Sequence, residues 1–285
     1  MALEVSAGPV VSFAPGDGAV RDEVEQFGWP EQMLGCRHVP EAGPAAGVVV
    51  CLGAPFGAGA DEGRAARLGR RLTRAGVAVQ RFHPRGTAPS DGDPAAVSFA
   101  TLVDDAAQAC DLLRDRTGVE RVGLVGARLG ALVALRLAQR WAGTPVVLWE
   151  PVVDPRRLVE QAARARAAGA RPVGADRHGD DRPPDLFDSA LCTELIDGAA
   201  IGDLSGELST RSGPLLVVQT GAGECLVPGY ESLVARCRAR GLAVEARCHP
   251  CDAERDGTVV PGAPADALVE ATASWLYDRL LPTSP

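Results

Sequence analysis

The sequence has no lysine and no asparagine, so all 29 of its basic residues are arginines. Without lysine, both a Schiff-base lysine and the lysine of a phosphate-binding loop are excluded. Without asparagine, a cysteine protease that orients its histidine with Asn is excluded. The 37 acidic residues outnumber the arginines and give a net charge of -8. Because phosphate neutralisation needs a basic face, this balance argues against nucleic-acid binding, although a local basic patch stays open.

Long apolar runs are missing as well. No stretch approaches the roughly 18 to 20 apolar residues that cross a bilayer, and residues 1–10 lack the basic start and apolar core of a signal peptide. We therefore expect a cytoplasmic protein that does not insert into membranes, in which most of the eight cysteines are reduced. Abundant Ala, Gly, Arg and Pro, with Lys and Asn absent, is typical of a GC-rich bacterial genome.

The 285 residues are 46% hydrophobic, enough for a sizeable core. From residue 47 onward, short apolar runs alternate with helix-period segments, which predicts an α/β fold with a mostly parallel sheet and helices on both faces. Residues 1–46 are expected to form a pair of leading antiparallel strands. The remaining strands are expected at 48–52, 77–81, 122–125, 145–149, 215–219 and 243–247, and the helices at 61–75, 98–116, 129–141, 230–240 and 264–281.

Residues 153–213 break this alternation. The segment is much longer than an ordinary connection, which indicates a lid or inserted subdomain. Its first part, 155–170, has a helical pattern, and 171–184 is a polar loop. We expect one domain, with its core formed by residues 1–152 and 214–285.

Between a predicted strand and a predicted helix, Gly126 to Gly130 has the spacing of the nucleophile elbow, G-x-S-x-G. The glycines let strand and helix come close, and the central residue adopts a strained positive φ. Here the central residue is Arg128. Because an arginine cannot attack a carbonyl, an acyl-enzyme formed through this position is excluded.

Three further candidates follow other strands. Glu150 and Glu224 each follow a predicted strand, and His249 follows the last one. The carboxyl ends of strands in a doubly wound sheet converge on one crevice, where a carboxylate and a histidine can form an acid-base pair. The alternative is two solvated loop carboxylates and a turn histidine with no function.

Two backbone N–H groups and the Arg128 side chain could each interact with negative charge near this turn. Phe56, which follows a proline without an N–H, and Leu129 could supply N–H donors to an oxyanion. A cation at a helix N-terminus opposes the helix dipole unless an anion is held there. That anion could be Glu224 or Glu150, making Arg128 a structural ion pair. It could instead be a substrate carboxylate or enolate, making Arg128 an electrophilic clamp.

Four segments carry a family likeness: Gly53–Phe56 before the helix bearing Arg64, Gly126–Ala131, Val146–Val153 and Ala263–Thr272. Together they resemble the exosortase A system-associated hydrolases of the second type, over most of residues 35–285. This group is a branch of the α/β-hydrolase superfamily whose elbow likewise carries Arg in place of Ser. The resemblance implies an α/β-hydrolase fold and the label hydrolase. Where the group has a Glu-Glu pair, this sequence has Ala58-Gly59, so any role of that pair does not carry over.

The C-x-x-C motif formed by Cys248 and Cys251 has redox or zinc spacing. The next predicted helix begins too late for a thioredoxin-type site, and zinc would need Cys225 to join the pair. Two reduced turn cysteines are the simpler interpretation, with Cys225 as a weak candidate nucleophile. We expect no metal and no cofactor.

Two functional hypotheses follow. In the first, the chain is an enzyme whose base is His249, oriented by Glu224 or Glu150, while Arg128 and the N–H groups of Leu129 and Phe56 hold developing negative charge. It would hydrolyse a small-molecule acyl or ester substrate, or eliminate an acyloxy group in a biosynthetic step. In the second, it is a catalytically inactive binding or scaffold protein. The sequence predicts neither the substrate nor the oligomeric state.

Overall fold

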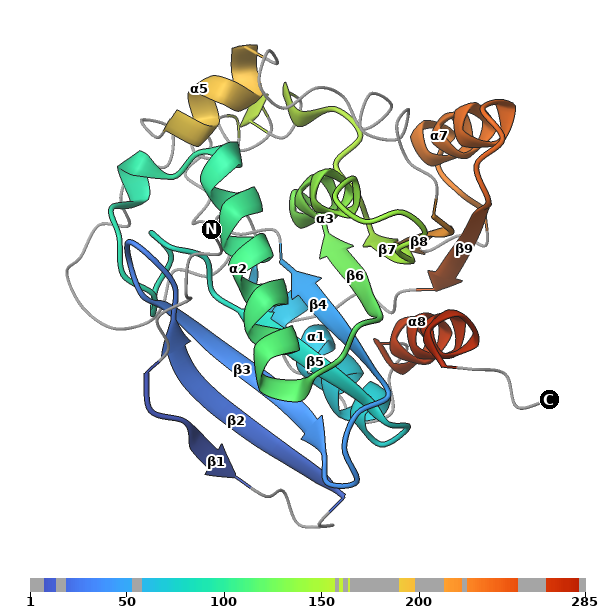
Figure 1. The fold of residues 1–285 in the computed structure, drawn as a ribbon. Coiled ribbons are helices and arrows are strands. Elements are labelled where there is room, and N and C mark those ends of the chain that lie inside the picture. Colours follow the sequence, from blue (N-terminus) through green and yellow to red (C-terminus); the bar gives the residue numbers. More distant parts are fainter. Residues whose placement is uncertain are drawn as a thin grey trace.

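The computed structural model describes residues 8–13, 19–52, 58–156, 159–160, 164, 190–197, 213–221, 225–250 and 265–281. Within these ranges, strands form one sheet with the order β1-β2-β3-β5-β4-β6-β7-β8-β9 (Figure 1). Pairing is antiparallel from β1 to β3 and between β3 and β5, and parallel across the rest of the sheet. The strands are β1 (Val11–Phe13), β2 (Val20–Phe27), β3 (Met33–Pro40), β4 (Ala46–Cys51), β5 (Val77–Phe82), β6 (Val122–Ala127), β7 (Val146–Trp149), β8 (Leu215–Gly221) and β9 (Val244–Pro250).

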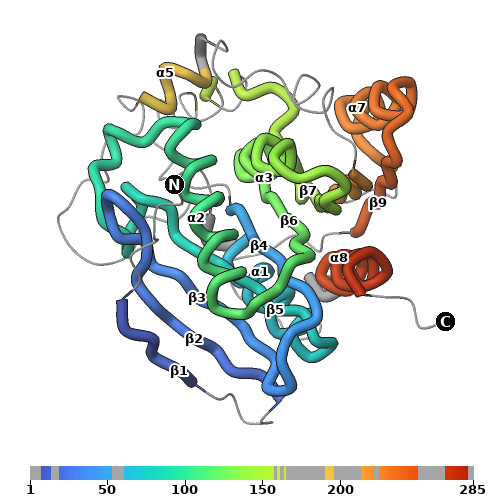
Figure 2. The backbone as a smooth tube through the Cα atoms, viewed as in Figure 1, coloured from blue at the N-terminus to red at the C-terminus, as the bar shows by residue number. Residues whose placement is uncertain are grey.

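Helices cover both faces of this sheet. Buried side chains of α2 (Phe99–Thr117), α3 (Gly130–Ala138) and α7 (Pro228–Ala239) form one apolar core with one face. Those of α1 (Ala58–Thr73) and α8 (Ala265–Leu280) form a second core with the other face. Figure 2 shows β1 and β9 at opposite edges of the sheet. The predicted mostly parallel sheet between two helical layers is confirmed.

The predicted elements are found with small shifts at their ends. Three antiparallel strands lead the sheet where two were expected. β2 and β3 form a pair, and β1 is added to it beside β2. The helix expected to begin at residue 61 begins at Ala58, and the helix expected to reach residue 141 ends at Ala138. Ser98 caps α2 through a capping box with Thr101, which fixes the start of that helix.

Most of the predicted lid lies outside the described residues, so the lid stays a prediction. Its described part includes α5 (Ala190–Asp197) and short helical pieces at 155–156, 159–160 and 164. α5 packs beside the start of α2, where Leu191 N–H donates to Val97 O at 2.8 Å and Glu194 accepts from Phe99 N–H at 2.7 Å. None of the described helices has the length and apolar run that a bilayer crossing requires.

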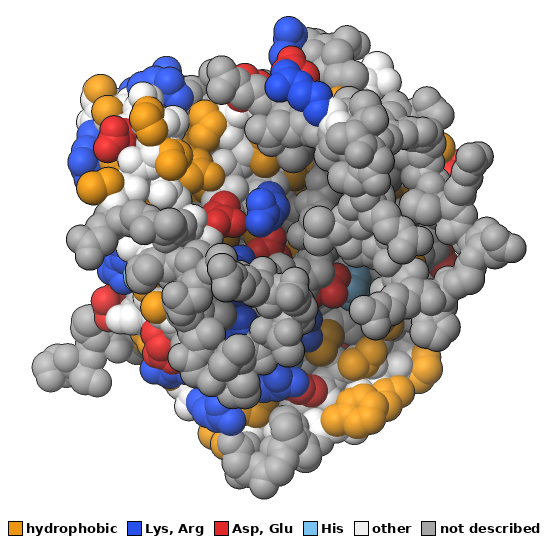
Figure 3. Space-filling model, turned by 180° about the vertical axis from the view of Figure 1, so that it is seen from behind, with side chains coloured by type: hydrophobic (Ala, Val, Ile, Leu, Met, Phe, Trp, Pro, Cys, Tyr) orange, Lys and Arg blue, Asp and Glu red, His pale blue; other side chains and the backbone are white. Residues whose placement is uncertain are grey.

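Acidic and basic side chains lie next to one another on the face seen in Figure 3. On the described part of that face they are mixed rather than separated by sign. This mixture matches the many close arginine–carboxylate pairs of the chain, such as Arg71 with Glu270 at 2.7 Å.

The turn between β6 and α3 has the close approach that its glycines predict. A Cβ atom on Gly126 would lie 2.5 Å from the carbonyl oxygen of Gly130. A Cβ atom on Gly130 would lie 2.2 Å from the carbonyl oxygen of Cys51, at the end of β4. Both neighbours are backbone atoms that cannot move aside, so only glycine fits at either position. The turn therefore holds Arg128 at a fixed place beside the ends of β4 and β6.

Candidate functional site

Arg128 and Glu150 are the two non-glycine residues with positive φ in the described part of the chain, at 51° and 45°. Arg128 follows β6 and Glu150 follows β7, so they sit at the carboxyl ends of adjacent parallel strands. Backbone hydrogen bonds hold both: Arg128 N–H donates to Trp149 O at 2.9 Å, and Glu150 N–H donates to Val218 O at 2.8 Å. Two strained residues are thus fixed side by side at one edge of the sheet.

The guanidinium of Arg128 contacts two carboxylates from different elements. Its Nε lies 3.1 Å from Oδ2 of Asp61 in α1, and its Nη2 lies 3.2 Å from Oε2 of Glu150. Its Nη1 forms no hydrogen bond or ion pair with the residues that the structure describes. The Arg128 side chain is 42% exposed, whereas the Asp61 side chain is 3% exposed. Asp61 and Glu150 therefore hold the guanidinium in place, while part of the Arg128 side chain stays accessible to solvent.

Asp61 is a site residue that the sequence reasoning missed. It also accepts a hydrogen bond from Nη1 of Arg64, one helical turn further on, at 3.2 Å. Burial raises the pKa of Asp61 above its ordinary value, while Arg128 and Arg64 oppose that rise. An acidic residue in the first turn of the helix that follows β4 was the available signal, but the sequence gives no reason to pair it with Arg128.

Two side chains, one from β8 and one from α7, hydrogen-bond to Glu150 and to the next residue, Pro151. The Thr220 hydroxyl, near the end of β8, hydrogen-bonds to Oε1 of Glu150. The hydroxyl of Tyr230, in the first turn of α7, donates to Pro151 O at 3.2 Å. Burial, with the nearby charge of Glu150, raises the pKa of Tyr230 to about 12. Tyr230 is therefore a neutral donor at physiological pH.

His249 lies in β9, opposite Thr220 in the parallel register of β8 and β9. Its Nε2 is buried and has no hydrogen-bond partner among the described residues. Burial, with the charge of Arg247, lowers the pKa of His249, so the ring is neutral at pH 7. Glu224 and Phe56 lie outside the described residues, so the predicted contact between His249 and Glu224 and the donor role of Phe56 stay predictions.

Leu129 is the other predicted backbone donor. It occupies the N-cap of α3 and is fully buried. Its N–H has no acceptor within the described ranges, whereas Arg128 N–H donates to Trp149 O at 2.9 Å and Ala131 N–H donates to Arg128 O at 3.2 Å. A free N–H at a helix N-terminus beside Arg128 is suited to an oxygen that carries negative charge.

The seven described cysteines are unbridged, and Cys251 lies outside the described residues. Cys225 is exposed, and its carbonyl accepts a hydrogen bond from the Gln219 amide at 3.3 Å. Cys248 is half-buried, with its Sγ 3.6 Å from the same amide. No group of three or more His, Cys, Asp or Glu side chains that could hold a metal occurs among the described residues.

The sheet order, the two helical layers and the tight turn after β6 define an α/β-hydrolase fold. Residues 44–176, a little under half of the chain, match the family model described as serine aminopeptidase, S33. A comparison with curated protein sequences finds no match.

Solved structures of esterases share this fold. One is Est1E from Butyrivibrio proteoclasticus with bound ferulic acid, which is 16% identical with a TM-score of 0.62 and covers 88% of this chain and 97% of its own. Another is an esterase from Pyrococcus furiosus, also 16% identical, with a TM-score of 0.63 and 98% of both chains covered. DcsB in complex with its substrate analogue is 14% identical, with a TM-score of 0.55 and coverage of 96% and 99%. At these identities the likeness establishes the fold.

Proposed function

We propose that the chain is an α/β-hydrolase-fold enzyme that lacks the elbow serine and acts on an acyl or ester group of a small molecule. The observation that carries this proposal is the strained pair Arg128 and Glu150, which occupies adjacent strand ends and is joined by an ion pair of 3.2 Å. Strained non-glycine residues persist only where the surrounding structure over-determines them, and they cluster at functional sites. The esterase neighbours and the serine aminopeptidase family model support the hydrolase class.

In this proposal Arg128 is an electrophilic residue. Its accessible end, together with the free N–H of Leu129, donates hydrogen bonds to the carbonyl oxygen as that oxygen becomes negative. Asp61 and Glu150 hold the guanidinium in place before the substrate arrives, so little reorganisation is needed during the reaction.

His249 is the proposed general base, because it is neutral at pH 7 and its Nε2 has no partner among the described residues. In hydrolysis it takes a proton from water while the water oxygen bonds to the acyl carbon. Collapse of the oxyanion breaks the bond to the alkoxy oxygen, which leaves with the proton from His249. In elimination, His249 instead takes a proton from the carbon next to the one that bears the acyloxy group. A carbon–carbon double bond then forms as the acyloxy group leaves as a carboxylate.

The experiment measures turnover of p-nitrophenyl esters with acyl chains from acetyl to octanoyl, and of acyloxy compounds by mass spectrometry of the alkene product. We expect Arg128→Gln to lower kcat/KM by about 10²- to 10³-fold, and His249→Ala by about 10²- to 10⁴-fold. The matched control is Arg71→Gln, which removes an exposed arginine–carboxylate pair elsewhere and should leave kcat/KM unchanged.

Two outcomes contradict the proposal. If the folded Arg128→Gln and His249→Ala variants turn over at the wild-type rate, the site assignment is wrong. If the wild-type protein turns over no member of either substrate panel, the catalytically inactive binding protein becomes the better interpretation. In that protein, Arg128 would serve as the ion-pair partner of Asp61 and Glu150.

A further inference from the structure

Arg128 offers a ligand the Nη1 end of its guanidinium. Nε donates to Asp61 at 3.1 Å, and Nη2 forms an ion pair with Glu150 at 3.2 Å. Nη1 forms no hydrogen bond or ion pair with the described residues. Nη1 carries two N–H donors, and with 42% of the side chain exposed we take it as the open end of Arg128.

The charges around this end cancel. Arg128 and Arg64 contribute two positive charges, and Asp61 and Glu150 contribute two negative charges. The two side chains that contact Glu150 and Pro151 from β8 and α7 are neutral, because they are the Thr220 hydroxyl and the Tyr230 phenol. The N-terminus of α3 adds only a partial positive charge.

Asp61 contributes most to this cancellation. Its side chain is 3% exposed and pairs with both arginines, whereas the Glu150 side chain is 20% exposed and pairs with Arg128 but not with Arg64. A buried charge is screened less by water than an exposed one, so the field of Asp61 acts on Arg128 more strongly.

We infer that Asp61 is a specificity-determining residue that makes the open end of Arg128 select a neutral acyl carbonyl and reject a carboxylate. The inference rests on the proposed function in one respect, namely that this end of Arg128 faces the substrate. A bound carboxylate would lose part of its hydration and bring the cluster to a net charge of -1, whereas the oxyanion of the reaction forms together with the proton that His249 takes up and leaves the total charge unchanged. A neutral carbonyl adds no charge to the cluster. The acid released by hydrolysis or elimination is therefore not retained.

The experiment compares binding of hexanoate and hexanamide, two probes of nearly equal shape that differ in charge, by isothermal titration at low salt. In the wild-type protein we expect hexanoate to bind no more tightly than hexanamide. Asp61→Asn leaves the cluster with a net charge of +1, so we expect the affinity for hexanoate relative to hexanamide to rise at least tenfold. The gain should shrink as salt is added, because charges at a partly exposed site are screened.

The double variant Asp61→Asn with Arg64→Gln is the matched control. It removes one acid and one base, so the cluster is neutral again and the relative affinity for hexanoate should return to the wild-type value. Adding Arg128→Gln to Asp61→Asn should abolish the gain, since the donors themselves are then gone.

If Asp61→Asn is folded by circular dichroism and shows no gain for hexanoate, or if the charge-neutral double variant shows the same gain, the inference is overturned. Should Asp61→Asn fail to fold, Glu150→Gln makes the same change of charge at the more exposed acid and should give a smaller gain. No gain there would overturn the inference. These readouts need no turnover, so they remain informative whether or not Arg128→Gln lowers ester turnover.

Discussion

Two arginine clusters of this molecule use the same side-chain chemistry in opposite ways. Arg37 lies in β3 with its side chain 2% exposed, and every nitrogen of its guanidinium has a partner. Its Nε and Nη2 bond to Glu23 at 3.0 Å and 2.5 Å, and its Nη1 bonds to Glu25 at 2.6 Å. Arg128 pairs through Nε and Nη2, has a strained backbone, and has no partner for Nη1 among the described residues. Full pairing in a regular strand is typical of a structural arginine, and partial pairing at a strained turn is typical of a functional one.

The first prediction tests whether Arg37 contributes more to stability than Arg128 does. Arg37→Met leaves the buried carboxylate of Glu25 with Arg116 as its remaining partner at 2.8 Å. We expect the free energy of unfolding to fall by about 3 kcal/mol, at the lower end of the range for breaking a buried pair. Arg128→Gln should cost about 1 kcal/mol, because its side chain is 42% exposed and Asp61 keeps Arg64 as a partner. Urea denaturation measures both. Equal losses would show that the two clusters do the same structural work.

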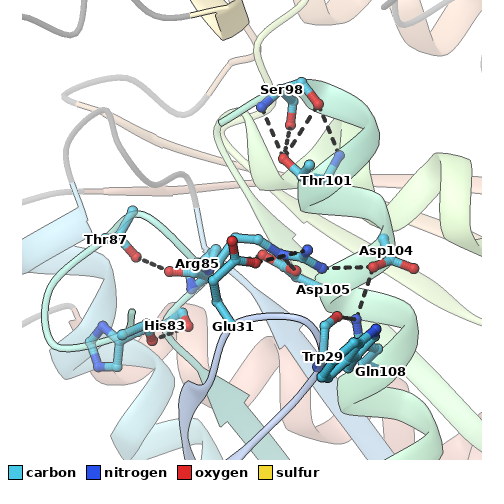
Figure 4. A network of polar contacts seen from close by, with 12 residues as sticks. Trp29, Glu31, His83, Arg85, Thr87, Ser98, Thr101, Asp104, Asp105 and Gln108 are labelled. Carbon is cyan, nitrogen blue, oxygen red and sulfur yellow. Dashed lines mark hydrogen bonds and ion pairs between the residues drawn. The ribbon is translucent and has the colours of Figure 1, made fainter. Parts of the chain in front are cut away.

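A second structural cluster lets the comparison be tested with pH (Figure 4). Arg85 bonds to the buried Asp105 through Nε at 2.5 Å, and to the more exposed Asp104 through Nη2 at 2.7 Å. Burial raises the pKa of Asp105 to about 6, against the lowering effect of Arg85. Because this value lies above the ordinary 3.8, Asp105 is protonated in the folded state but ionised in the unfolded state between about pH 4 and pH 6. The contribution of Asp105 to stability therefore decreases as pH rises from about 4 to about 6 and is constant above.

Asp105→Asn should remove this decrease, which amounts to on the order of 3 kcal/mol. The measurement is urea denaturation from pH 4 to pH 8, compared with Asp104→Asn, which removes an exposed carboxylate from the same guanidinium and should keep the decrease. An unchanged pH profile in Asp105→Asn would show that Asp105 stays ionised throughout and that Arg85 outweighs its burial.

The third prediction concerns the turn that strains Arg128. Gly130→Ala places a Cβ atom against backbone at the end of β4, so we expect a loss of about 1–3 kcal/mol in stability and a large loss of turnover. Gly229→Ala in α7 is the matched control, because its Cβ atom meets nothing within 4 Å and alanine favours helix. Because Gly229 is the second residue of the helix, the free energy of unfolding of this control should stay the same or rise by up to about 0.5 kcal/mol. A neutral result for Gly130→Ala would mean that the turn relaxes and that the position of Arg128 is not fixed.

The fold could be predicted from the sequence because its strands are buried on both faces and its helices have one apolar side. The position of Arg128 followed from two glycines and a strand–helix boundary, and Glu150 followed from its place at a strand end. Asp61 could not be predicted, because it is 67 residues away from Arg128 in the chain and no spacing links them. Only the order β5-β4-β6, which sets α1 beside the turn after β6, brings the two together.

The last prediction, with the smallest expected effect, concerns the groups that hold the Glu150 side chain in place. Thr220→Val removes a hydroxyl that hydrogen-bonds to this carboxylate but keeps the shape of the side chain. Glu150 then depends on Arg128 alone, so we expect kcat/KM to fall by about threefold to tenfold, matching the 0.5–1.5 kcal/mol of one hydrogen bond. Tyr230→Phe is the control, since its hydroxyl contacts a backbone carbonyl and no carboxylate. If Thr220→Val loses no more activity than Tyr230→Phe, Glu150 is held by the strained backbone and Arg128 without help from β8.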